Sequence, residues 1–440
     1  MNRGELEQLA NRMAHTLAGQ GVGAGDRVTL SLPNSIEFLA AVYACWKLGA
    51  TPQPISAWLP EREFDAIVEL AQPRVVIDQK WEVAADAPDT PLADVVSDPW
   101  KAMTSGGSTG RPKLILAGGP GTIDPEAHPS LLIVRDGTHM MPGPLYHNGP
   151  FVWSTTALLG GNHVVLGGKF DAQRTLELID RHHPETMYIV PTMMARIWKL
   201  PIEVRERYDV SSLKAVWHLA APCPVWLKEA WIEWLGPDAI YELYAGTEAQ
   251  SATIITGREW LEHKGSVGKP MAGEMQAFDE NGNQLPPGEV GEIYMRAPAN
   301  TKTYEYVGAT ARTLPGGWES LGDMGSVDAD GYIYLSDRQT DMILVGGANV
   351  YPAEIEAALD EHPRVRSSAV VGLPDDDLGS RPHAIVQTDD GGAIDEDDIR
   401  AHLVERLVRY KIPRSFEFVA EPLRDDAGKV RRSALRAERV

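Results

Sequence analysis

Short apolar segments alternate with amphipathic ones along the chain, and this alternation restricts the fold more than any other feature. Apolar residues recur at helical spacing over 6–17, and Ser35 is placed to cap a second helix that runs to Leu48. The segments 27–32 and 75–77 have the composition of short, buried strands. Strands that alternate with amphipathic helices predict an α/β fold with layered subdomains.

A chain of 440 residues is too long for one ordinary compact domain. Near its end the pattern changes: 332–335 reads as a strand that 336–338 interrupts, and a small α+β arrangement follows. We therefore expect a large N-terminal domain over 1–336 and a small, mobile C-terminal domain over 337–440, with the hinge at Asp337. The elements predicted for the small domain are a helix from 353, strands near 368–371 and 383–386, and a helix near 399–408.

Charge and composition exclude some classes of protein. The formal net charge of −21 argues against nucleic-acid binding, which needs a basic face, but a few local cations can still hold a small polyanion. No apolar stretch is long enough for a transmembrane segment, and the N-terminus has no apolar signal core. Cys45 and Cys223 lie far apart and form no disulfide framework, so a cytoplasmic location is expected. A homodimer is an open expectation.

A segment rich in glycine and hydroxyl side chains predicts a phosphate site. Its glycines let backbone N–H groups converge on an anion, its hydroxyls add donors, and a lysine adds a cation. Pro112 before Lys113 excludes the Walker pattern, and a flexible linker is the alternative interpretation of the segment by itself. The residues expected to bind the phosphates are Thr104, Ser105, Gly106, Gly107, Ser108, Thr109, Gly110 and Lys113.

This loop resembles the phosphate-binding signature of the adenylate-forming superfamily, which contains acyl-CoA synthetases, peptide-synthetase adenylation domains and luciferases. Further matching segments follow in that superfamily's order, which makes chance agreement improbable. They are Pro-Leu-Tyr-His-Asn-Gly at 144–149, Tyr-Ala-Gly-Thr-Glu at 244–248, Gly-Trp and Leu-Gly-Asp within 317–323, Asp-Arg-Gln-Thr-Asp at 337–341, the segment 346–356, 410–414 and 428–432.

The resemblance implies an acid–thiol ligase that uses ATP, Mg²⁺ and coenzyme A. A carboxylic acid would attack the α-phosphate of ATP, and the acyl-adenylate would then pass its acyl group to coenzyme A. Lys429 would bridge the carboxylate and the α-phosphate, and Thr247 would donate to that phosphate. Glu248 would hold Mg²⁺, and His147 would lie between the acyl pocket and the approaching thiol.

The remaining assignments also follow from the resemblance. The small domain would swing about Asp337 between the two half-reactions, one pose inserting Lys429 and the other the glycine turn. The residues implied for adenine and ribose are Ala221, Pro222, Tyr244, Asp323 and Arg338, with Tyr244 stacked on adenine. Those implied for coenzyme A are Gly346 and Gly347, and those for the acyl pocket are Tyr146, His147, Ala220, Ala245 and Gly246.

The chain departs from the superfamily at Leu114, Ala245 and Thr340, none of which removes a catalytic group. Small pocket residues, with Met193 and Met194 as adaptable apolar liners, favour a bulky apolar acid. The segments 218–224 and 245–250 resemble a bacterial subgroup that includes bile-acid and steroid side-chain ligases, so the resemblance implies a steroid or bile acid, with a fatty acid also expected. Alternatives remain open. They are an aromatic-acid CoA ligase, an acyl-AMP ligase that loads another acceptor, and a non-catalytic relative that binds nucleotide.

Overall fold

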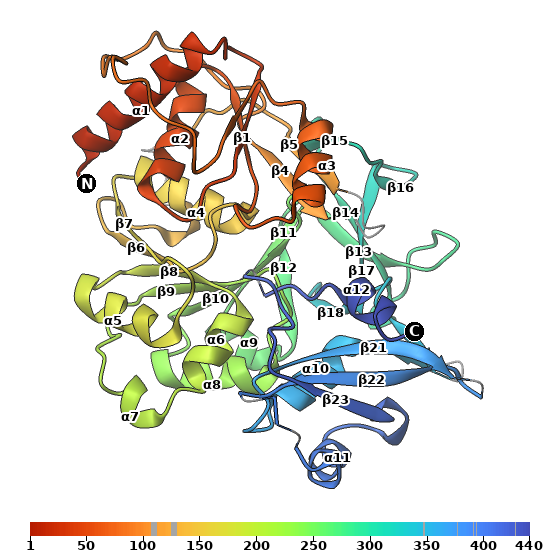
Figure 1. Cartoon of the computed structure of the whole chain (residues 1–440). Coiled ribbons are helices and arrows are strands. Elements are labelled where there is room, and N and C mark those ends of the chain that lie inside the picture. The colour runs from red at the N-terminus through yellow and green to blue at the C-terminus, as the bar shows by residue number, and fades with distance from the viewer. Residues whose placement is uncertain are drawn as a thin grey trace.

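The computed structural model of the 440-residue chain describes residues 1–106, 112–124, 130–345, 348–375, 377–389, 391–392, 394–426 and 428–440. Its fold is mixed α/β with a large N-terminal part and a small C-terminal part, as the sequence predicts (Figure 1). No helix in the described ranges is long and apolar enough to cross a membrane.

The first part of the chain forms a small parallel sheet with three helices. Asn2 and Glu5 close a capping box at the start of the first helix, and Ser35 accepts a hydrogen bond from the Phe38 amide to cap the second, as predicted. The sheet has the order β2-β1-β3. The elements are α1 (Arg3–Gly19), β1 (Arg27–Leu30), α2 (Ile36–Lys47), β2 (Thr51–Pro54), α3 (Glu61–Ala71) and β3 (Val75–Ile77).

A hairpin, joined by a distant third strand, carries the phosphate-loop segment. Strand β4 (Ala102–Gly106) pairs with β5 (Pro112–Ala117), and β5 pairs with β15 (Tyr304–Val307). Residues 107–111, which lie between β4 and β5 in the sequence, are outside the described residues. The pairing brings Tyr306 beside the strand that carries Lys113.

A 12-stranded sheet forms the body of the large part. Strands β7, β6, β8, β9 and β10 run parallel in that spatial order, and β11 and the strands beyond it are antiparallel. Its strands are β6 (Thr138–Met141), β7 (His163–Leu166), β8 (Thr186–Ile189), β9 (Ala215–His218), β10 (Ile240–Ala245), β11 (Ala252–Thr256), β12 (Ser266–Ala272), β13 (Glu274–Phe278), β14 (Gly291–Arg296), β16 (Arg312–Leu314), β17 (Trp318–Val327) and β18 (Ile333–Arg338).

Helices follow the parallel strands and bury their apolar sides in one large core. That core includes Phe151, Met194 and Trp231, all almost fully buried. Met193 and Met194, predicted as pocket liners, belong to this core. The helices are α4 (Asn148–Leu159), α5 (Ala172–His182), α6 (Pro191–Trp198), α7 (Ile202–Arg205), α8 (Val225–Leu235) and α9 (Gly257–Glu262), with the short 3-10 helix η1 (Ser130–Leu132).

The C-terminal part has its own core under a 5-stranded sheet (Figure 1). The predicted helices and strands are present here, with somewhat different bounds. The elements are β19 (Ile343–Val345), β20 (Ala348–Val350), α10 (Pro352–Asp360), β21 (Ser367–Asp375), β22 (Gly379–Gln387), α11 (Glu396–Val404), the 3-10 helix η2 (Arg409–Lys411), β23 (Ser415–Val419) and α12 (Arg432–Ala437).

One local prediction is wrong. Residues 336–338 do not interrupt a strand, because β18 continues through them to Arg338. Pairing with β17 is the physical reason: Asp323 lies opposite Arg338, and Met324 lies opposite Asp337. The ladder overrides the low strand propensity of serine and aspartate.

Candidate active site

Four parallel strands bring the predicted site residues to one edge of the central sheet. The carboxyl ends of parallel strands meet at the same edge, where ligands bind in open α/β sheets. The loop 142–147 follows β6, α6 begins just after β8, the loop 219–224 follows β9, and 246–248 follows β10. The acyl, adenine and metal segments of the sequence therefore converge for a topological reason.

Glu248 lies buried at this edge, with 4% of its surface exposed. Its Oε1 atom accepts a hydrogen bond from the Tyr306 hydroxyl at 2.5 Å and lies 3.1 Å from Nζ of Lys113. The Lys113 ammonium also donates to the Tyr306 hydroxyl at 2.9 Å and lies 4.1 Å from the centre of that ring. Burial, followed by the carboxylate of Glu248, raises the pKa of Tyr306 strongly, so this hydroxyl stays a donor.

The turn after β10 depends on small residues. A Cβ atom at Gly246 would lie 2.4 Å from Cδ1 of Leu321 and 2.9 Å from Oε2 of Glu248. Ala220 and Ala249 hold left-handed backbone, with φ of 74° and 54°. Non-glycine residues adopt this region at a cost, and they do so here on both sides of the predicted nucleotide site. Ala245 ends β10, and Thr247 lies between Gly246 and Glu248.

The predicted ribose residues form a connected group. The Tyr244 hydroxyl donates to Oδ2 of Asp323 at 2.7 Å, and Nε of Arg338 lies 3.2 Å from Oδ1 of the same carboxylate. Pairing of β17 with β18 fixes the second contact, because Asp323 and Arg338 lie opposite each other. The Tyr244 ring packs beside a small apolar cluster that includes Met275 and Ile293. Its predicted stacking on adenine stays a prediction, as do the adenine contacts of Ala221 and Pro222, which follow Ala220.

His147 is held neutral beside the acyl segment. Its ring lies 4.3 Å from that of Tyr146, and its Nε2 atom is buried with no hydrogen-bond partner among the described residues. Burial, followed by the cation of Lys429, lowers the pKa of His147 to about 3. Burial raises the pKa of Tyr146 to about 12, and its hydroxyl bonds to Ser56. The buried Nε2 is therefore available to a ligand rather than to the protein.

Lys429 reaches this edge from the C-terminal part. Desolvation by neighbouring groups lowers the pKa of Lys429 although part of its side chain remains exposed, and its ammonium also interacts electrostatically with Asp425, Arg338 and Glu248. The preceding Gly428, at φ 78°, approaches helix α6 so closely that a Cβ atom would lie 2.5 Å from Oγ1 of Thr192. A side chain at 428 would push the loop away, so the glycine is what lets Lys429 enter.

An ion pair and a set of hydrogen bonds from a lysine join the large and small parts of the chain. Arg431 pairs with Glu63 on α3 at 3.1 and 3.2 Å. Lys199, just after α6, donates to the carbonyls of Asp360 at 2.8 Å and Val365 at 2.5 Å. The described arrangement is therefore one in which Lys429 faces the site.

The phosphate loop is described only at its ends. Thr104 accepts a hydrogen bond from Gln53 at 2.6 Å, and Ser105 and Gly106 lie on β4. Lys113 is the second residue of the return strand β5 and contacts Glu248. The predicted loop residues Gly107, Ser108, Thr109 and Gly110 lie outside the described residues, as do Gly346 and Gly347 of the predicted coenzyme A turn.

Sequence reasoning missed two residues of the site. Tyr306 contacts Glu248 from a strand with no motif of its own, and only the β5–β15 pairing brings it there. Lys101, with 7% of its surface exposed, donates to Oδ1 of Asn148, the first residue of α4. Burial lowers the pKa of Lys101 to about 8, and the Glu248 carboxylate opposes that shift. A lysine that directly precedes β4, three residues before the predicted phosphate loop, was the available signal.

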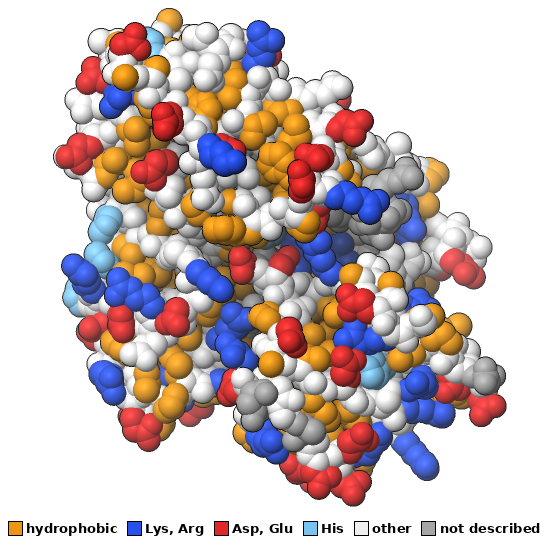
Figure 2. Space-filling view, in the orientation of Figure 1, with side chains coloured by type: hydrophobic (Ala, Val, Ile, Leu, Met, Phe, Trp, Pro, Cys, Tyr) orange, Lys and Arg blue, Asp and Glu red, His pale blue; other side chains and the backbone are white. Residues whose placement is uncertain are grey.

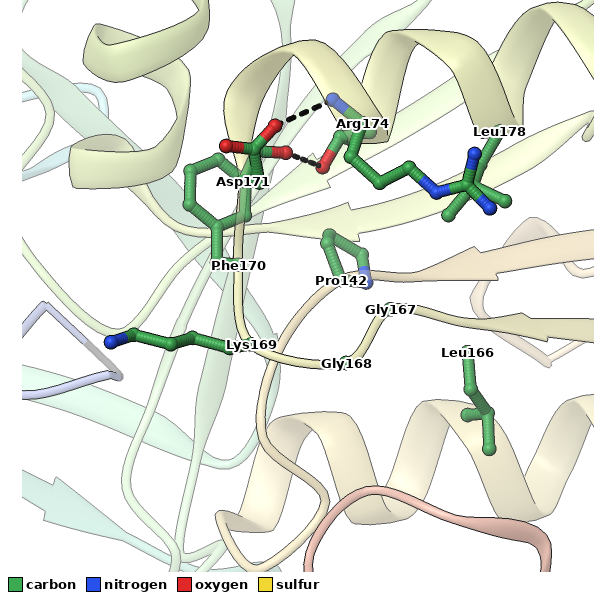
Figure 3. A pocket seen from close by; sticks show the side chains of 10 residues that line it. Pro142, Leu166, Gly167, Gly168, Lys169, Phe170, Asp171, Arg174 and Leu178 are labelled. Carbon is green, nitrogen blue, oxygen red and sulfur yellow. Dashed lines mark hydrogen bonds between the residues drawn. The ribbon is translucent and has the colours of Figure 1, made fainter.

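Two cavities border the site without enclosing it. Figure 3 shows the smaller, of about 180 Å³, beside the loop after β7 and the start of α5. Asp171 there accepts from the Arg174 amide at 2.7 Å and so caps the helix. The larger cavity, of about 840 Å³, is lined by Gln250, Tyr304 and Glu319 among others. None of the residues predicted for the site lines the smaller cavity.

The donor set around Glu248 fits Mg²⁺. This ion prefers oxygen ligands and is usually held by one or two carboxylates together with substrate phosphates. Among the described residues, no group of three or more His, Cys, Asp or Glu side chains that could hold a metal ion comes together. The missing side chain at Gly246 also keeps Oε2 of Glu248 uncrowded. Glu248 is therefore the residue that would hold the ion.

Cations gather locally on an acidic protein. Figure 2 shows Lys and Arg side chains clustered around the middle of this face, where the parts of the chain meet. The net charge of −21 is thus unevenly distributed, and the centre can accept a polyanion.

Comparison with known proteins agrees with this geometry. A sequence model of the AMP-binding enzyme family matches residues 1–105 and 88–305, and one of the AMP-binding enzyme C-terminal domain matches 354–429. Feruloyl-CoA synthase from Amycolatopsis sp is 32% identical, over 98% of this chain and 92% of that protein. A fatty acid–[acyl-carrier-protein] ligase from Streptomyces coeruleorubidus is 30% identical, over 98% of this chain and 90% of its own.

A solved structure is also similar. The o-succinylbenzoate CoA synthetase from Bacillus subtilis, in complex with its acyl-adenylate intermediate, superposes with a TM-score of 0.82 at 26% identity. The match covers 98% of this chain and 92% of the other. The same synthetase has a solved complex with ATP and a magnesium ion. The family models together match more than half of the chain, and the chain therefore belongs to the family of AMP-binding enzymes.

Proposed function

We propose that this protein is an acid–CoA ligase that works through an acyl-adenylate. The observation that carries the proposal is that Lys429, from the C-terminal part, interacts electrostatically with Glu248, Arg338 and His147, while Gly428 packs closely against α6. The named relatives support it, because they are ligases that join acids to coenzyme A or to a carrier protein.

The first half-reaction brings anions together. A carboxylate oxygen of the acid forms a bond to the α-phosphorus of ATP, and the bond to the bridging oxygen breaks, so that pyrophosphate leaves with the electron pair. Lys429 neutralises charge between the carboxylate and the α-phosphate, where a fixed cation acts most strongly because the site is partly dehydrated. Asp323 accepts from the ribose hydroxyls, and Arg338 stays beside it.

Glu248 and Lys113 are the residues that would neutralise the phosphates of ATP, one through a bound ion and the other directly. Glu248 would hold Mg²⁺, and the ion would supply positive charge that offsets the negative charge of the phosphates. Glu248 is pre-oriented for that ion by the Tyr306 hydroxyl. Lys113, which neutralises Glu248 in the structure, is close enough to turn toward the phosphates once the carboxylate has another cation.

The second half-reaction replaces AMP with a thiol. The sulfur of coenzyme A forms a bond to the acyl carbon, AMP leaves with the electron pair, and the thiol proton passes to solvent. We propose that the small domain turns about Asp337, removes Lys429 and presents the turn at Gly346 and Gly347. His147 is uncharged at neutral pH, so it adds no charge to the site. Its ring forms part of the wall at the acyl end.

An aromatic carboxylic acid is the substrate class we favour. Two of the three relatives reported above are named for feruloyl and o-succinylbenzoyl groups, and both are aromatic acids. The Tyr146 ring and the His147 ring, which lies tilted beside it, suit a flat acyl group at the acyl end of the site. This choice moves away from the steroid or bile acid expected from the sequence, and a fatty acid stays the second candidate because one relative is named for it.

The test uses the purified protein with ATP, Mg²⁺ and coenzyme A. It is given hydroxycinnamic acids, substituted benzoates, fatty acids of several lengths and bile acids, and products are read by mass spectrometry. An aryl-CoA thioester supports the proposal. A thioester from another class keeps the ligase and corrects the substrate. Acyl-AMP without thioester identifies another acceptor, and absence of both with ATP bound contradicts the proposed function.

A further inference from the structure

The loop that carries Lys429 is closed by its own backbone. Arg424 and Val430 pair as an antiparallel bridge at its base. The Lys429 amide donates to Oδ1 of Asp425 at 2.9 Å, and the Lys429 carbonyl accepts from the Asp425 amide at 2.9 Å. The Gly428 amide donates to the Asp425 carbonyl, also at 2.9 Å. Both backbone groups of Lys429 are thus fixed.

Arg424 fastens this loop to the body of the C-terminal part. Its Nη1 donates to the Gly428 carbonyl at 3.2 Å, directly before Lys429. Its Nη2 donates to the Ser368 carbonyl at 3.0 Å and to Oε2 of Glu356 at 2.9 Å, and its Nε donates to Ser367 at 3.2 Å. One rigid guanidinium therefore joins the loop to β21 and α10.

Glu356 is a buried carboxylate that binds both Arg424, at the base of the loop, and Arg432, which follows the loop. With 4% of its surface exposed, it accepts from Arg432 Nη2 at 2.8 and 2.9 Å and from the Val370 amide at 2.8 Å. Burial works to raise the pKa of Glu356, but Arg432 and Arg424 outweigh it and hold the pKa below its ordinary value. Arg432 pairs in turn with Asp341 at 2.8 Å, just beyond the proposed hinge.

We propose that Glu356, Arg424 and Arg432 are positioning residues that set the Lys429 loop for adenylation. The inference rests on the proposed function. A lysine has a long flexible stem, so the accuracy of its ammonium depends on where its backbone is held, and a misplacement of about 1 Å can cost on the order of 100-fold in rate. Arg424 is at the base of the loop, Arg432 follows the loop in the chain, and Glu356 on α10 binds both arginines. The predicted coenzyme A turn is a separate segment of the chain. Adenylation should therefore depend on them more than acyl transfer does.

Arg424→Lys tests the proposal, because lysine keeps the charge but cannot reproduce the forked set of bonds. Two half-reactions are measured on the full chain: acid-dependent pyrophosphate formation without coenzyme A, and thioester formation from supplied acyl-adenylate. We expect the first to fall at least tenfold in kcat, with KM for the acid within about twofold, and the second to stay within about threefold of wild type. Glu356→Gln should repeat this pattern and serves if Arg424→Lys does not fold.

Arg439→Lys is the matched control. Arg439 makes a comparable two-bond pair with Glu417 in the same part of the chain, at 2.6 and 2.8 Å, and does not contact the loop. Both half-reactions should stay near wild type in this variant. Lys429→Ala is the reference for complete loss of adenylation.

The outcomes separate the two claims. Equal loss of both half-reactions in Arg424→Lys, or no loss of adenylation while Lys429→Ala abolishes it, overturns the positioning role. Full adenylation by Lys429→Ala overturns the proposed function of Lys429 itself, whatever the other variants do.

Discussion

The Tyr306 hydroxyl donates to Oε1 of Glu248 at 2.5 Å, and Lys113 contacts both groups. Tyr306 comes from a strand that is distant in sequence from either partner, and β5–β15 pairing brings the three together. The proposed Mg²⁺ ligand is thus oriented before any nucleotide binds, which lowers the cost of binding.

Tyr306→Phe should lower acid-dependent pyrophosphate release roughly tenfold. A hydrogen bond to a charged acceptor contributes about 1.5 kcal/mol or more, and its loss leaves Glu248 free to turn. Steady-state kinetics at varied Mg²⁺ checks this, with a raised requirement for the ion as the signature. Tyr332→Phe is the control, because the Tyr332 hydroxyl donates to a different carboxylate, that of Glu259, at 2.8 Å. An equal effect of both substitutions would contradict the assignment.

Gly246→Ala should raise KM for ATP severalfold. The new Cβ would meet Leu321 at 2.4 Å and Oε2 of Glu248 at 2.9 Å, so the carboxylate must shift even if the leucine rotates away. Overpacking of this kind costs roughly 1–3 kcal/mol. Gly23→Ala is the control, since no atom lies within 4 Å of its added Cβ. Nucleotide titration by calorimetry gives the answer, and unchanged ATP affinity in Gly246→Ala would refute the crowding argument.

Lys101→Met should stabilise the protein at pH 7 and lose that advantage as the pH rises. The folded-state pKa of Lys101 is about 8 and its ordinary value is 10.5, so the unfolded chain binds more protons between these values. Wild-type stability therefore increases with pH over that window. The desolvation cost removed at pH 7 is up to roughly 3 kcal/mol, less about 1 kcal/mol for the lost bond to Asn148.

Urea unfolding at pH 7 and pH 9.5 measures this difference. Lys302→Met, which removes an exposed ion pair with Glu305, should change stability little at either pH. A destabilised Lys101→Met at pH 7, or a gap that does not shrink at pH 9.5, would show that the ammonium is not penalised by its burial.

Lys199→Met should slow adenylation by loosening the contact between the two parts. Its ammonium donates to the carbonyl of Asp360, the last residue of α10, where a helix dipole favours a cation, and to the carbonyl of Val365 farther along the chain. Thioester formation from supplied acyl-adenylate should not fall. Lys264→Met, which breaks a pair with Glu229 inside the large part, is the control. A loss confined to the second half-reaction would mean that this arrangement serves acyl transfer instead.

The sequence predicted the fold well where the signal is local. The cap at Ser35 and the helical spacing depend on neighbouring residues, so they could be recognised without a structure. The strand break at 336–338 was wrong because pairing with β17 is a long-range interaction that local propensity does not contain. The backbone of Ser336 and Asp337 is therefore extended, because it pairs with β17.

The site was predictable only as far as its motifs extend. Residues from separate motifs interact in the structure: Lys429 interacts electrostatically with Glu248 and Arg338, and Arg338 pairs with Asp323. Tyr306 and Lys101 carry no motif, and their importance arises from strand pairing and from burial. The roles of the phosphate-loop glycines and of the coenzyme A turn stay predictions, because those residues lie outside the described part of the chain.

Acid-dependent exchange of labelled pyrophosphate into ATP, measured without coenzyme A, tests the central claim most directly. An enzyme that forms a bound acyl-adenylate reversibly must exchange pyrophosphate when acid and Mg²⁺ are present. We predict exchange that requires both and that disappears in Lys429→Ala. ATP binding with no exchange for any acid, or exchange that persists in Lys429→Ala, would contradict the account.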